Sequence, residues 1–174
     1  MEQLKHIIES LLFAAQEPVT IEQFKKILSV EHNESIIKML NQLAEEYETR
    51  KGGFYLKETA GGFRLKSRPE YGEWIKKLLA APFYSRLSKA ALETLSIIAY
   101  KQPILRAEIE YIRGVDSGGI IRNLLDKGLI KIIGRKDIPG KPILYGTTKR
   151  FLEVFELKSL KELPTLKEIT ELNN

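Results

Sequence analysis

Residues 118–147 read GGIIRNLLDKGLIKIIGRKDIPGKPILYGT, and two kinds of periodicity meet in this stretch. Its first part places four apolar residues on one face of a helix: Ile120, Ile121, Leu124 and Leu125. Gly128 is placed to end that helix, and two short apolar runs typical of strands follow at 129–133 and 143–147. A helix followed by a two-stranded hairpin predicts the third helix and the wing of a winged-helix domain.

The segment between the two strands, Gly134 to Lys141, contains a Gly-Lys pair like that of a phosphate-binding loop. Five residues separate Gly134 from Gly140, whereas a P-loop has four between its glycines. Pro142 follows Lys141, so the hydroxyl that a P-loop needs for magnesium is missing. We therefore expect a wing turn here, with no nucleotide and no other cofactor.

Two more helices precede this stretch. Ser88 is placed to cap the first, LSKAALETLSIIAY, which Pro103 stops. The second spans roughly Arg106–Ile112, and Asp116 or Ser117 is placed to cap the third. A short helix, KRFLEVFE, follows the second strand and closes the unit.

The first half of the chain shows the same order of elements. An amphipathic helix over LKHIIESLLFAA ends before Pro18, and the sequence TIEQ forms a capping box for a second helix at 21–28. A third helix begins near Asn33. Alternating apolar residues on both sides of Ala60-Gly61-Gly62 then predict a hairpin, and an apolar helical stretch around Trp74 follows it.

The two halves align at an offset of 85 residues, which places Pro18 opposite Pro103. The same offset pairs six apolar positions: Phe13 with Ile98, Ala14 with Ala99, Val19 with Ile104, Phe24 with Ile109, Ile36 with Ile121, and Leu40 with Leu125. A period this long indicates a duplicated domain. We predict a mainly α fold with small β wings, built as tandem winged-helix domains at 1–80 and 86–157. The segment 80–85 is the expected linker, and 158–174 is expected to be a loose tail.

The composition restricts the function classes. The chain has no cysteine, which excludes disulfides and thiolate metal sites, and no apolar run is long enough to span a membrane. Residues 1–85 carry 12 basic and 12 acidic side chains, so the net charge of +5 lies in the second half. A basic half is typical of proteins with anionic partners, although such an excess also aids solubility. The start of the chain has no signal-peptide pattern, so we expect a cytoplasmic protein.

No catalytic or metal-binding constellation appears in the sequence. The only two histidines, His6 and His32, are not paired at a metal-ligand spacing. The frame of a nucleophile elbow is absent around Ser117. We therefore expect no catalytic residue, no metal site and no enzymatic activity.

Nucleic acid is a candidate partner for the basic second half. Its third helix and wing carry four cations placed for phosphate contact: Arg122, Lys127, Lys131 and Lys141. The alternative reading, a solvated wing, remains open for each of them.

A long ungapped segment carries a family resemblance. Residues 87–130, LSKAALETLSIIAYKQPILRAEIEYIRGVDSGGIIRNLLDKGLI, together with GRKDIPGKPILYGTTKRFLEVF and SLKELP, closely resemble the segregation and condensation protein B (ScpB) family. The opening ESLLFAAQEPVT is also similar, and the resemblance covers nearly the whole chain. Leu105 departs from the Thr or Ser that the family often has there, so the following helix loses an N-cap worth ~1 kcal/mol.

The resemblance implies a bacterial, cytoplasmic, nucleoid-associated and non-enzymatic subunit with two winged-helix domains. Members of the family form homodimers and bind the kleisin ScpA, which bridges the heads of the SMC ATPase. The complex supports chromosome condensation and segregation at cell division. Chromosomal DNA would be contacted indirectly or weakly, and no membrane is involved.

The residues suggest where these contacts lie. Aromatic and arginine side chains are favoured interface anchors, so we predict kleisin contact at Tyr111, Ile112 and Arg113. Charge steering is expected from the wing tip, at Arg135, Lys136 and Asp137. The neutral first domain is expected to pair with its own copy through its first helix, at Leu4, Ile7, Ile8 and Leu11. The rival hypothesis is a DNA-binding winged-helix transcriptional regulator, whose affinity would fall steeply with salt.

Overall fold

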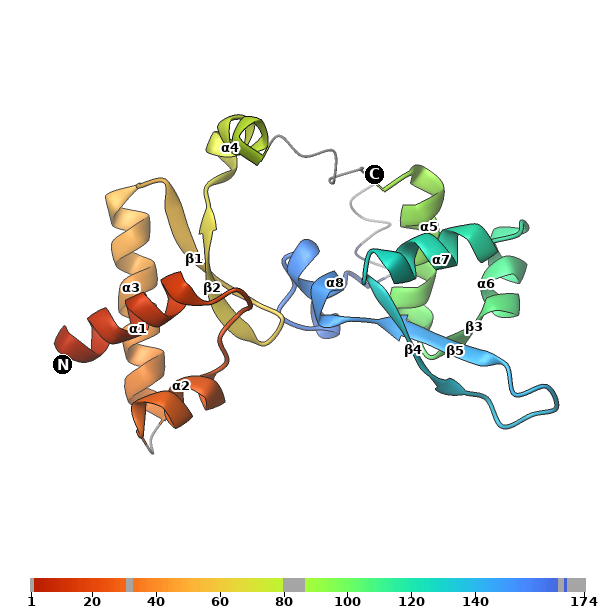
Figure 1. Ribbon diagram of the computed structural model, residues 1–174, viewed down its shortest axis with the longest axis horizontal. Coiled ribbons are helices and arrows are strands. Elements are labelled where there is room, and N and C mark those ends of the chain that lie inside the picture. The colour runs from red at the N-terminus through yellow and green to blue at the C-terminus, as the bar shows by residue number, and fades with distance from the viewer. Residues whose placement is uncertain (1, 31–32, 80–86, 166–167, 169–174) are drawn as a thin grey trace. The chain divides into compact units, whose positions relative to one another are not determined.

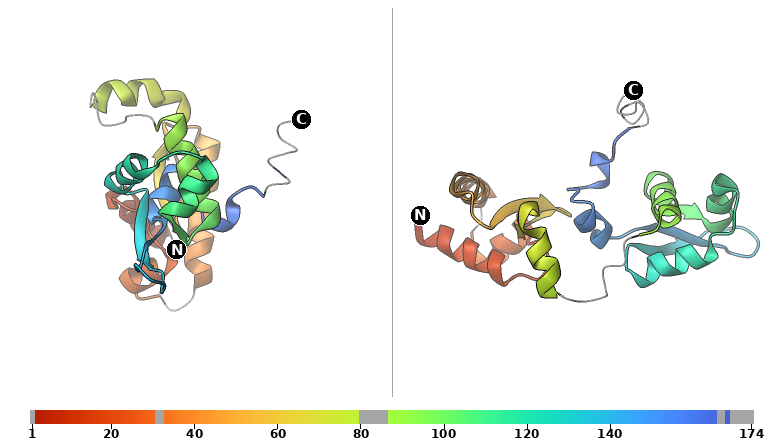
Figure 2. Two further views of the ribbon diagram at one scale, coloured as in Figure 1. Left: turned by 90° about the vertical axis from the view of Figure 1, so that its right-hand side faces the viewer. Right: turned by 90° about the horizontal axis from the view of Figure 1, so that it is seen from above.

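The computed structural model describes residues 2–30, 33–79, 87–165 and 168. The chain divides into two compact units, Met1–Pro82 and Phe83–Asn174 (Figures 1 and 2). The linker predicted at 80–85 lies outside the described residues, as do His32 and most of residues 166–174. Each unit is a winged-helix domain, with three helices followed by a β-hairpin, as the sequence predicts.

The first unit contains four helices and a two-stranded sheet, with a short 3₁₀ turn, η1, before the last helix. Their bounds are α1 Glu2–Ala14, α2 Ile21–Leu28, α3 Asn33–Arg50, β1 Phe54–Thr59, β2 Gly62–Ser67, η1 Pro69–Tyr71 and α4 Gly72–Leu79. The capping box predicted for α2 is confirmed, because the backbone N–H of Gln23 donates to Thr20 Oγ1 and the N–H of Thr20 donates to Gln23 Oε1. Ala60 and Gly61 form the turn between β1 and β2, both at positive φ, as a tight hairpin turn requires.

The hairpin of the first unit is joined to its helices through Val19. The backbone N–H of Val19 donates to the Phe63 carbonyl at 2.8 Å, and the N–H of Phe63 donates back to Val19 at 2.9 Å. A Cβ on Gly62 would lie 2.9 Å from the backbone of Val19, so only glycine allows this approach. Three helices and one face of the hairpin then enclose a core of nine buried residues: Ile8, Leu12, Val19, Phe24, Ile36, Met39, Leu40, Leu43 and Tyr47.

The second unit repeats this plan and adds a strand. Its elements are α5 Lys89–Lys101, β3 Ile104–Leu105, α6 Arg106–Arg113, α7 Gly118–Asp126, β4 Ile130–Arg135, β5 Ile143–Thr147, α8 Lys149–Val154 and η2 Leu160–Glu162. The sheet is antiparallel with the order β3-β5-β4. The sequence predicts β4 and β5 but not β3, which is too short for a recognisable alternation and corresponds to the Val19 bridge of the first unit.

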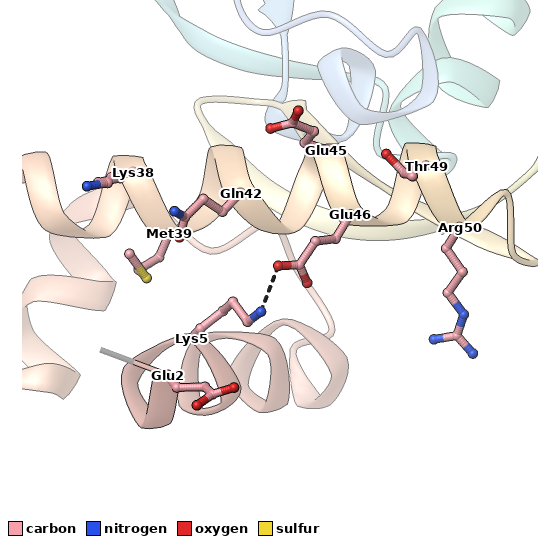
Figure 3. A pocket seen from close by; sticks show the side chains of 9 residues that line it. All are labelled: Glu2, Lys5, Lys38, Met39, Gln42, Glu45, Glu46, Thr49 and Arg50. Atoms are coloured by element: carbon pink, nitrogen blue, oxygen red, sulfur yellow. Dashed lines mark hydrogen bonds and ion pairs between the residues drawn. The ribbon is translucent and has the colours of Figure 1, made fainter.

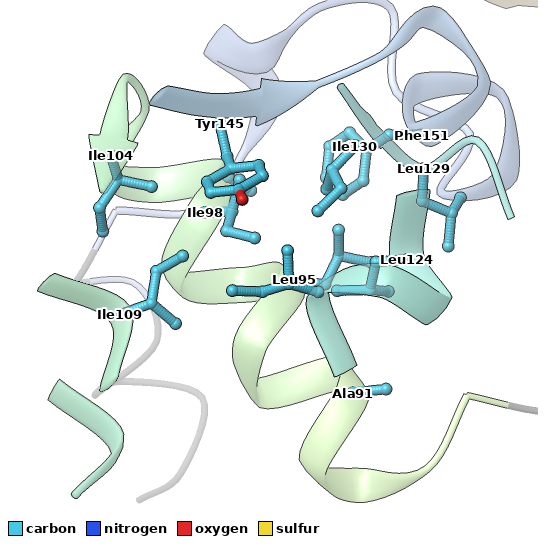
Figure 4. Packing of buried hydrophobic residues seen from close by; sticks show 12 residues of the cluster. Ala91, Leu95, Ile98, Ile104, Ile109, Leu124, Leu129, Ile130, Tyr145 and Phe151 are labelled. Carbon is cyan, nitrogen blue, oxygen red and sulfur yellow. The ribbon is translucent and has the colours of Figure 1, made fainter. Parts of the chain in front are cut away.

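The core of the second unit lies between α5, α6, α7 and the inner face of the sheet. Figure 4 shows Leu95 and Ile98 of α5 packed among Ile109, Leu124 and Tyr145. All five side chains are buried, and they come from four different elements. This packing fixes which face of each helix reaches the surface.

The side chain of Gln102 ties the end of α5 to β5. Its Nε2 donates to the Ala99 carbonyl and to Thr147 Oγ1, both at 3.0 Å, while the backbone N–H of Thr147 donates to Gln102 Oε1 at 2.7 Å. A Cβ on Gly146 would lie 2.8 Å from the same Oε1, so the strand passes close beneath the amide. The buried Thr147 is thereby fully satisfied, which is the usual condition for a polar group in a core.

The loose tail predicted at 158–174 is wrong for its first part. Leu157 and Leu163 pack against the second core, and the phenol of Tyr100 donates to the Pro164 carbonyl at 2.8 Å. Ser159 caps η2, and the carboxylate of Glu162 accepts from the N–H of Lys158 at 2.6 Å. Leu163, the hydrogen bond from Tyr100 and a local capping network thus hold a segment whose composition gives little sign of packing.

The 85-residue repeat is confirmed after the prolines but is wrong in the first helices. Phe13 is highly exposed whereas its predicted counterpart Ile98 is buried, and the exposed Ala14 is aligned with the buried Ala99. Three residues separate α1 from Pro18, but one separates α5 from Pro103. Because of this difference, the buried residues of α1 and α5 align at an offset of 87 residues instead of 85. Ile8 then lies opposite Leu95, and Leu12 lies opposite Ala99.

We predict that Gly62→Ala destabilises the first unit by about 2 kcal/mol, because the added methyl group must push against the backbone of Val19. The matched control is Gly53→Ala, where a Cβ meets nothing within 4 Å, and its effect should stay within about 0.5 kcal/mol. Urea denaturation followed by circular dichroism measures both. Equal stability of the two variants would contradict the proposed close approach.

Candidate partner-binding surfaces

The surface of α6 carries an open hollow with exposed aromatic and aliphatic side chains. It has a volume of about 620 Å³ and is lined by Lys101, Pro103, Ile104, Ala107, Glu108, Tyr111 and Ile112. Tyr111 is 88% exposed and Ile112 is 45% exposed, although both are large and apolar in part. Two of the predicted kleisin contacts therefore lie together on one surface, beside a cation and a carboxylate.

The start of α6 is capped by a side chain of its own first turn. Leu105 provides no side-chain cap, as predicted, but its backbone N–H donates to Glu108 Oε2 at 2.8 Å. Half of a capping box is thus retained, which offsets part of the loss expected from leucine at this position. Gly114, at a φ of 71°, ends the helix in the left-handed region.

An ion-pair network holds α6 to the loop before α7. Arg106 donates through Nε to Glu110 at 2.6 Å and through Nη2 to Asp116 at 2.5 Å. Glu110 also accepts from the backbone N–H of Ser117 at 3.1 Å. The hydrogen bond from Arg106 and then that from Ser117 hold the pKa of Glu110 below its ordinary value, while Glu110 raises the pKa of Arg106. Because all three side chains are at the surface, the network orients α6 more than it stabilises the unit.

The structure separates Arg113 from the other predicted kleisin contacts on α6. Its side chain is only 8% exposed, lies 3.7 Å from the carboxylate of Glu93 on α5, and donates to Ser117 Oγ at 3.0 Å. On a helix the position two residues after Tyr111 points to a different side, so Arg113 faces its own unit. Its Nε is buried without a hydrogen-bond partner among the described residues, which offsets part of what the other two contacts contribute.

The wing tip presents the three other predicted contacts differently. Arg135 donates to the Lys141 carbonyl at 3.0 Å, so its side chain braces the turn. Lys136 Nζ lies 4.0 Å from Glu108 Oε1, which links the wing to the α6 surface. Asp137 is exposed at the tip. Of these three, Lys136 is the residue that approaches the lining of the hollow, through Glu108.

The predicted dimer contact on α1 requires a correction. Ile8 is fully buried in the first core, and Leu4 and Leu11 pack half-buried against it, so these three form the inner face of the helix. Ile7 is the one predicted contact on the exposed face, which it shares with Phe13. The apolar stripe read from the sequence is the core stripe, and the surface lies on the opposite side.

The sequence reasoning treated α4 as an ordinary helix and missed its exposed surface. None of its described side chains is buried; Trp74 is 63% exposed and Leu78 is 83% exposed. These two residues, four apart, lie on one side of the helix, whereas Glu73, Lys76 and Lys77 supply charge. The sequence could have indicated this surface. The apolar residues of α4 follow a hairpin that already completes the winged-helix domain, so the core of that domain does not need them.

A second hollow, of about 770 Å³, lies between α1 and α3 (Figure 3). Its lining is mostly charged and electrically balanced, with three acids and three bases among nine residues: Glu2, Lys5, Lys38, Met39, Gln42, Glu45, Glu46, Thr49 and Arg50. Lys5 Nζ donates to Glu46 Oε1 at 2.7 Å, and this hydrogen bond raises the pKa of Lys5. Such a surface offers few apolar anchors for a partner.

The cations predicted for nucleic acid lie on two elements and the wing turn. Arg122 is exposed on α7 and Lys127 is half-buried at its end. Lys131 is exposed on β4, and Lys141 is exposed in the turn at a φ of 41°. The structure gives no group of three metal-ligating side chains among the described residues. Within the same residues no helix is long and apolar enough to cross a membrane.

A family model described as segregation and condensation complex subunit ScpB matches residues 6–166. The chain belongs to the ScpB family. A similar relative is the segregation and condensation protein B of Syntrophotalea carbinolica, which is 52% identical over 170 residues, covering 98% of this chain and 85% of that protein.

Two solved ScpB structures are also similar. The crystal structure of ScpB from Mycobacterium tuberculosis is 32% identical with a TM-score of 0.43, covering 90% of this chain and 96% of that one. A dimer of an ScpB N-terminal domain complexed with an ScpA peptide is 28% identical with a TM-score of 0.41, covering 44% of this chain and 95% of that one.

We predict a pH-dependent effect of Glu110→Gln in this ScpB chain. A carboxyl whose folded pKa is lowered stabilises the fold above its unfolded pKa, near 4.5, and loses that contribution as the pH falls through the folded value. The variant should therefore melt at a lower temperature than wild type at pH 7, and the difference should shrink as the pH falls below 4.5 and through the lowered pKa of Glu110. Thermal melts across this pH range measure it.

The matched control is Asp126→Asn, which removes a carboxylate of the same unit that has no hydrogen bond to the described residues. A melting-temperature difference for Glu110→Gln that persists unchanged in acid would refute the ionic role.

Proposed function

We propose that this chain is a non-enzymatic adapter subunit of a bacterial SMC–kleisin complex, which binds the kleisin ScpA as a homodimer and supports chromosome condensation and segregation at cell division. Membership of the ScpB family over nearly the whole chain supports this role. The exposed surfaces are those of a protein that binds partners, and we place it in the cytoplasm, associated with the nucleoid.

The observation that carries the kleisin contact is the exposed pair Tyr111 and Ile112. Their hollow on α6 combines an aromatic anchor and an aliphatic one with the charges of Lys101 and Glu108. Interfaces commonly have this composition, with apolar anchors that are buried on binding and a polar rim that fixes the orientation. Lys136 extends the rim onto the wing through its approach to Glu108.

The homodimer contact is placed on α4 rather than on the inner face of α1. An eight-residue helix is too short to be stable by itself in water, and its Trp74 and Leu78 gain little burial within the described unit. A second copy of the first domain is a suitable cover, because this half of the chain carries no net charge to oppose pairing. The exposed Ile7 and Phe13 on α1 add apolar surface to the same unit.

A non-enzymatic role is consistent with the electrostatics. Lys5, Arg106 and Glu110 have shifted pKa values that are explained by a neighbouring ion pair or hydrogen bond on a helix surface. Burial, and then the hydrogen bond to Glu9, raises the pKa of the phenol of Tyr47, which lies in the first core. None of these groups faces the hollow on α6, and such arrangements are structural.

We predict that Tyr111→Ala weakens binding of the kleisin from the same genome about tenfold, because an interface anchor is lost while the fold is kept. Isothermal titration calorimetry measures the affinity. The matched control is Val154→Ala, which removes an exposed apolar side chain of α8 and should leave the affinity unchanged. Unchanged binding by Tyr111→Ala would move the contact away from α6, and binding of duplex DNA in its place would favour the DNA-binding regulator.

We predict that Leu78→Glu converts the dimer to a monomer. Light scattering behind a sizing column should give about twice 19.9 kDa for wild type and 19.9 kDa for the variant. Lys76→Glu introduces the same side chain on the charged side of α4 and should remain dimeric. A dimeric Leu78→Glu variant would show that α4 is not in the interface.

A further inference from the structure

The strand β4 has an outer edge to which no other described strand is paired. In the sheet order β3-β5-β4, it has β5 on one side and lies at the edge on the other. Figure 1 shows β4 and β5 leading into a hairpin that extends beyond the helices of its own unit. An edge with free backbone groups is a template for a further strand.

The backbone hydrogen bonds show which groups face outward. The N–H of Thr148 donates to the Leu129 carbonyl, and the N–H of Lys136 donates to the Pro142 carbonyl. Since bonded and non-bonded pairs alternate in an antiparallel ladder, the N–H and C=O of Ile130 and Ile132 point away from β5. Ile130 is only 2% exposed, whereas Ile132 is 55% exposed, so the donor and acceptor of Ile132 are the ones available to a strand from outside.

The same edge carries exposed apolar side chains. Ile132 is 55% exposed and Ile133 is 45% exposed, in the middle of a strand whose only buried residue is Ile130. A register shift between Ile132 and Gly134 interrupts the alternation, which brings two consecutive isoleucines to the surface. Natural proteins usually protect such an edge, so two exposed β-branched residues here indicate a binding function.

The charge around these isoleucines selects the partner. Residues 130–142 carry Lys131, Arg135, Lys136 and Lys141 against one acid, Asp137, a net charge of +3. This excess opposes edge-to-edge pairing with a second copy of β4. Nucleic acid phosphates would match the charge but would leave both isoleucines uncovered, whereas an extended peptide with alternating acidic and apolar residues matches both.

We propose that the outer edge of β4 binds an extended acidic and apolar peptide segment of a partner protein as a fourth strand of the sheet. Main-chain hydrogen bonds centred on Ile132 supply the pairing. Apolar side chains of the added strand cover Ile132 and Ile133, and its carboxylates approach Lys131 and the wing cations. The backbone edge of β4 is separate from the hollow on α6, because α6 directly follows β3 at the opposite edge of the sheet. Lys136 borders both surfaces through its approach to Glu108.

The test uses the full chain and a fluorescein-labelled peptide of alternating glutamate and valine, about nine residues long. Fluorescence anisotropy should rise and saturate with this peptide. A peptide with lysine in place of each glutamate should bind at least about tenfold more weakly. Hydrogen exchange should show that the amide of Ile132 becomes protected when the acidic peptide is added.

Two substitutions at one position separate the backbone contribution from the side chain. Ile132→Pro removes an outward N–H and should weaken the acidic peptide at least about tenfold, since an edge position tolerates proline within the hairpin. Ile132→Thr keeps the N–H and a β-branched side chain, so its affinity for the acidic peptide should fall less than that of Ile132→Pro. Thermal melting checks that both variants fold, and the exchange measurement on wild type does not depend on them.

Each contrary outcome overturns the proposal. Absence of saturable binding, equal binding of the lysine peptide, or full affinity of a folded Ile132→Pro variant would each show that β4 does not add an acidic strand. Salt-sensitive binding of duplex DNA without peptide binding would make the wing a nucleic-acid contact. A change from dimer to monomer in Ile132→Pro would show that a second copy occupies the edge. Failure of the adapter proposal would leave these results unaffected, because the kleisin plays no part in them.

Discussion

The first unit depends on the pair of backbone hydrogen bonds between Val19 and Phe63. This pair joins the connection between α1 and α2 to the hairpin, so that the hairpin closes the core that the three helices leave open on one side. Gly62 allows the approach, since a Cβ there would meet the backbone of Val19. The second unit solves the same problem with the short strand β3 paired to β5. In both units a proline precedes the closing residue and ends the preceding helix before it.

Much of this fold follows from the sequence because its helices have strong apolar periodicity and recognisable caps. Thr20 and Ser88 cap their helices as predicted, and the hairpins fall where the periodicity changes. The closing strand β3 and the docked segment around Leu163 depend on contacts with distant residues, which a local pattern does not contain. The offset between the buried residues of α1 and α5 differs from 85 because the connection to the proline is longer after α1 than after α5. An alignment without gaps does not detect this difference in length.

The candidate surfaces were harder to predict, because residue type alone does not say which side of a helix faces the core. Tyr111 and Arg113 look equally suited to an interface, yet one is exposed and the other forms an internal contact with Glu93. On α1 the most regular apolar stripe is the buried one, so the sequence pattern does not identify Phe13 as an exposed residue. The exposed isoleucines of β4 could not be recognised from the sequence, because their exposure depends on how the rest of the unit packs.

Each unit encloses its own core, and the two clusters have no described residue in common. The buried pattern is largely the same in both, whereas the exposed residues differ: a tryptophan and a leucine on α4 in one, a tyrosine and isoleucines on α6 and β4 in the other. The two units thus share an interior pattern and differ in the residues that they expose. A substitution that disrupts one interior spares the other surface, so defects in the two halves should be separable genetically and should complement each other within a mixed assembly.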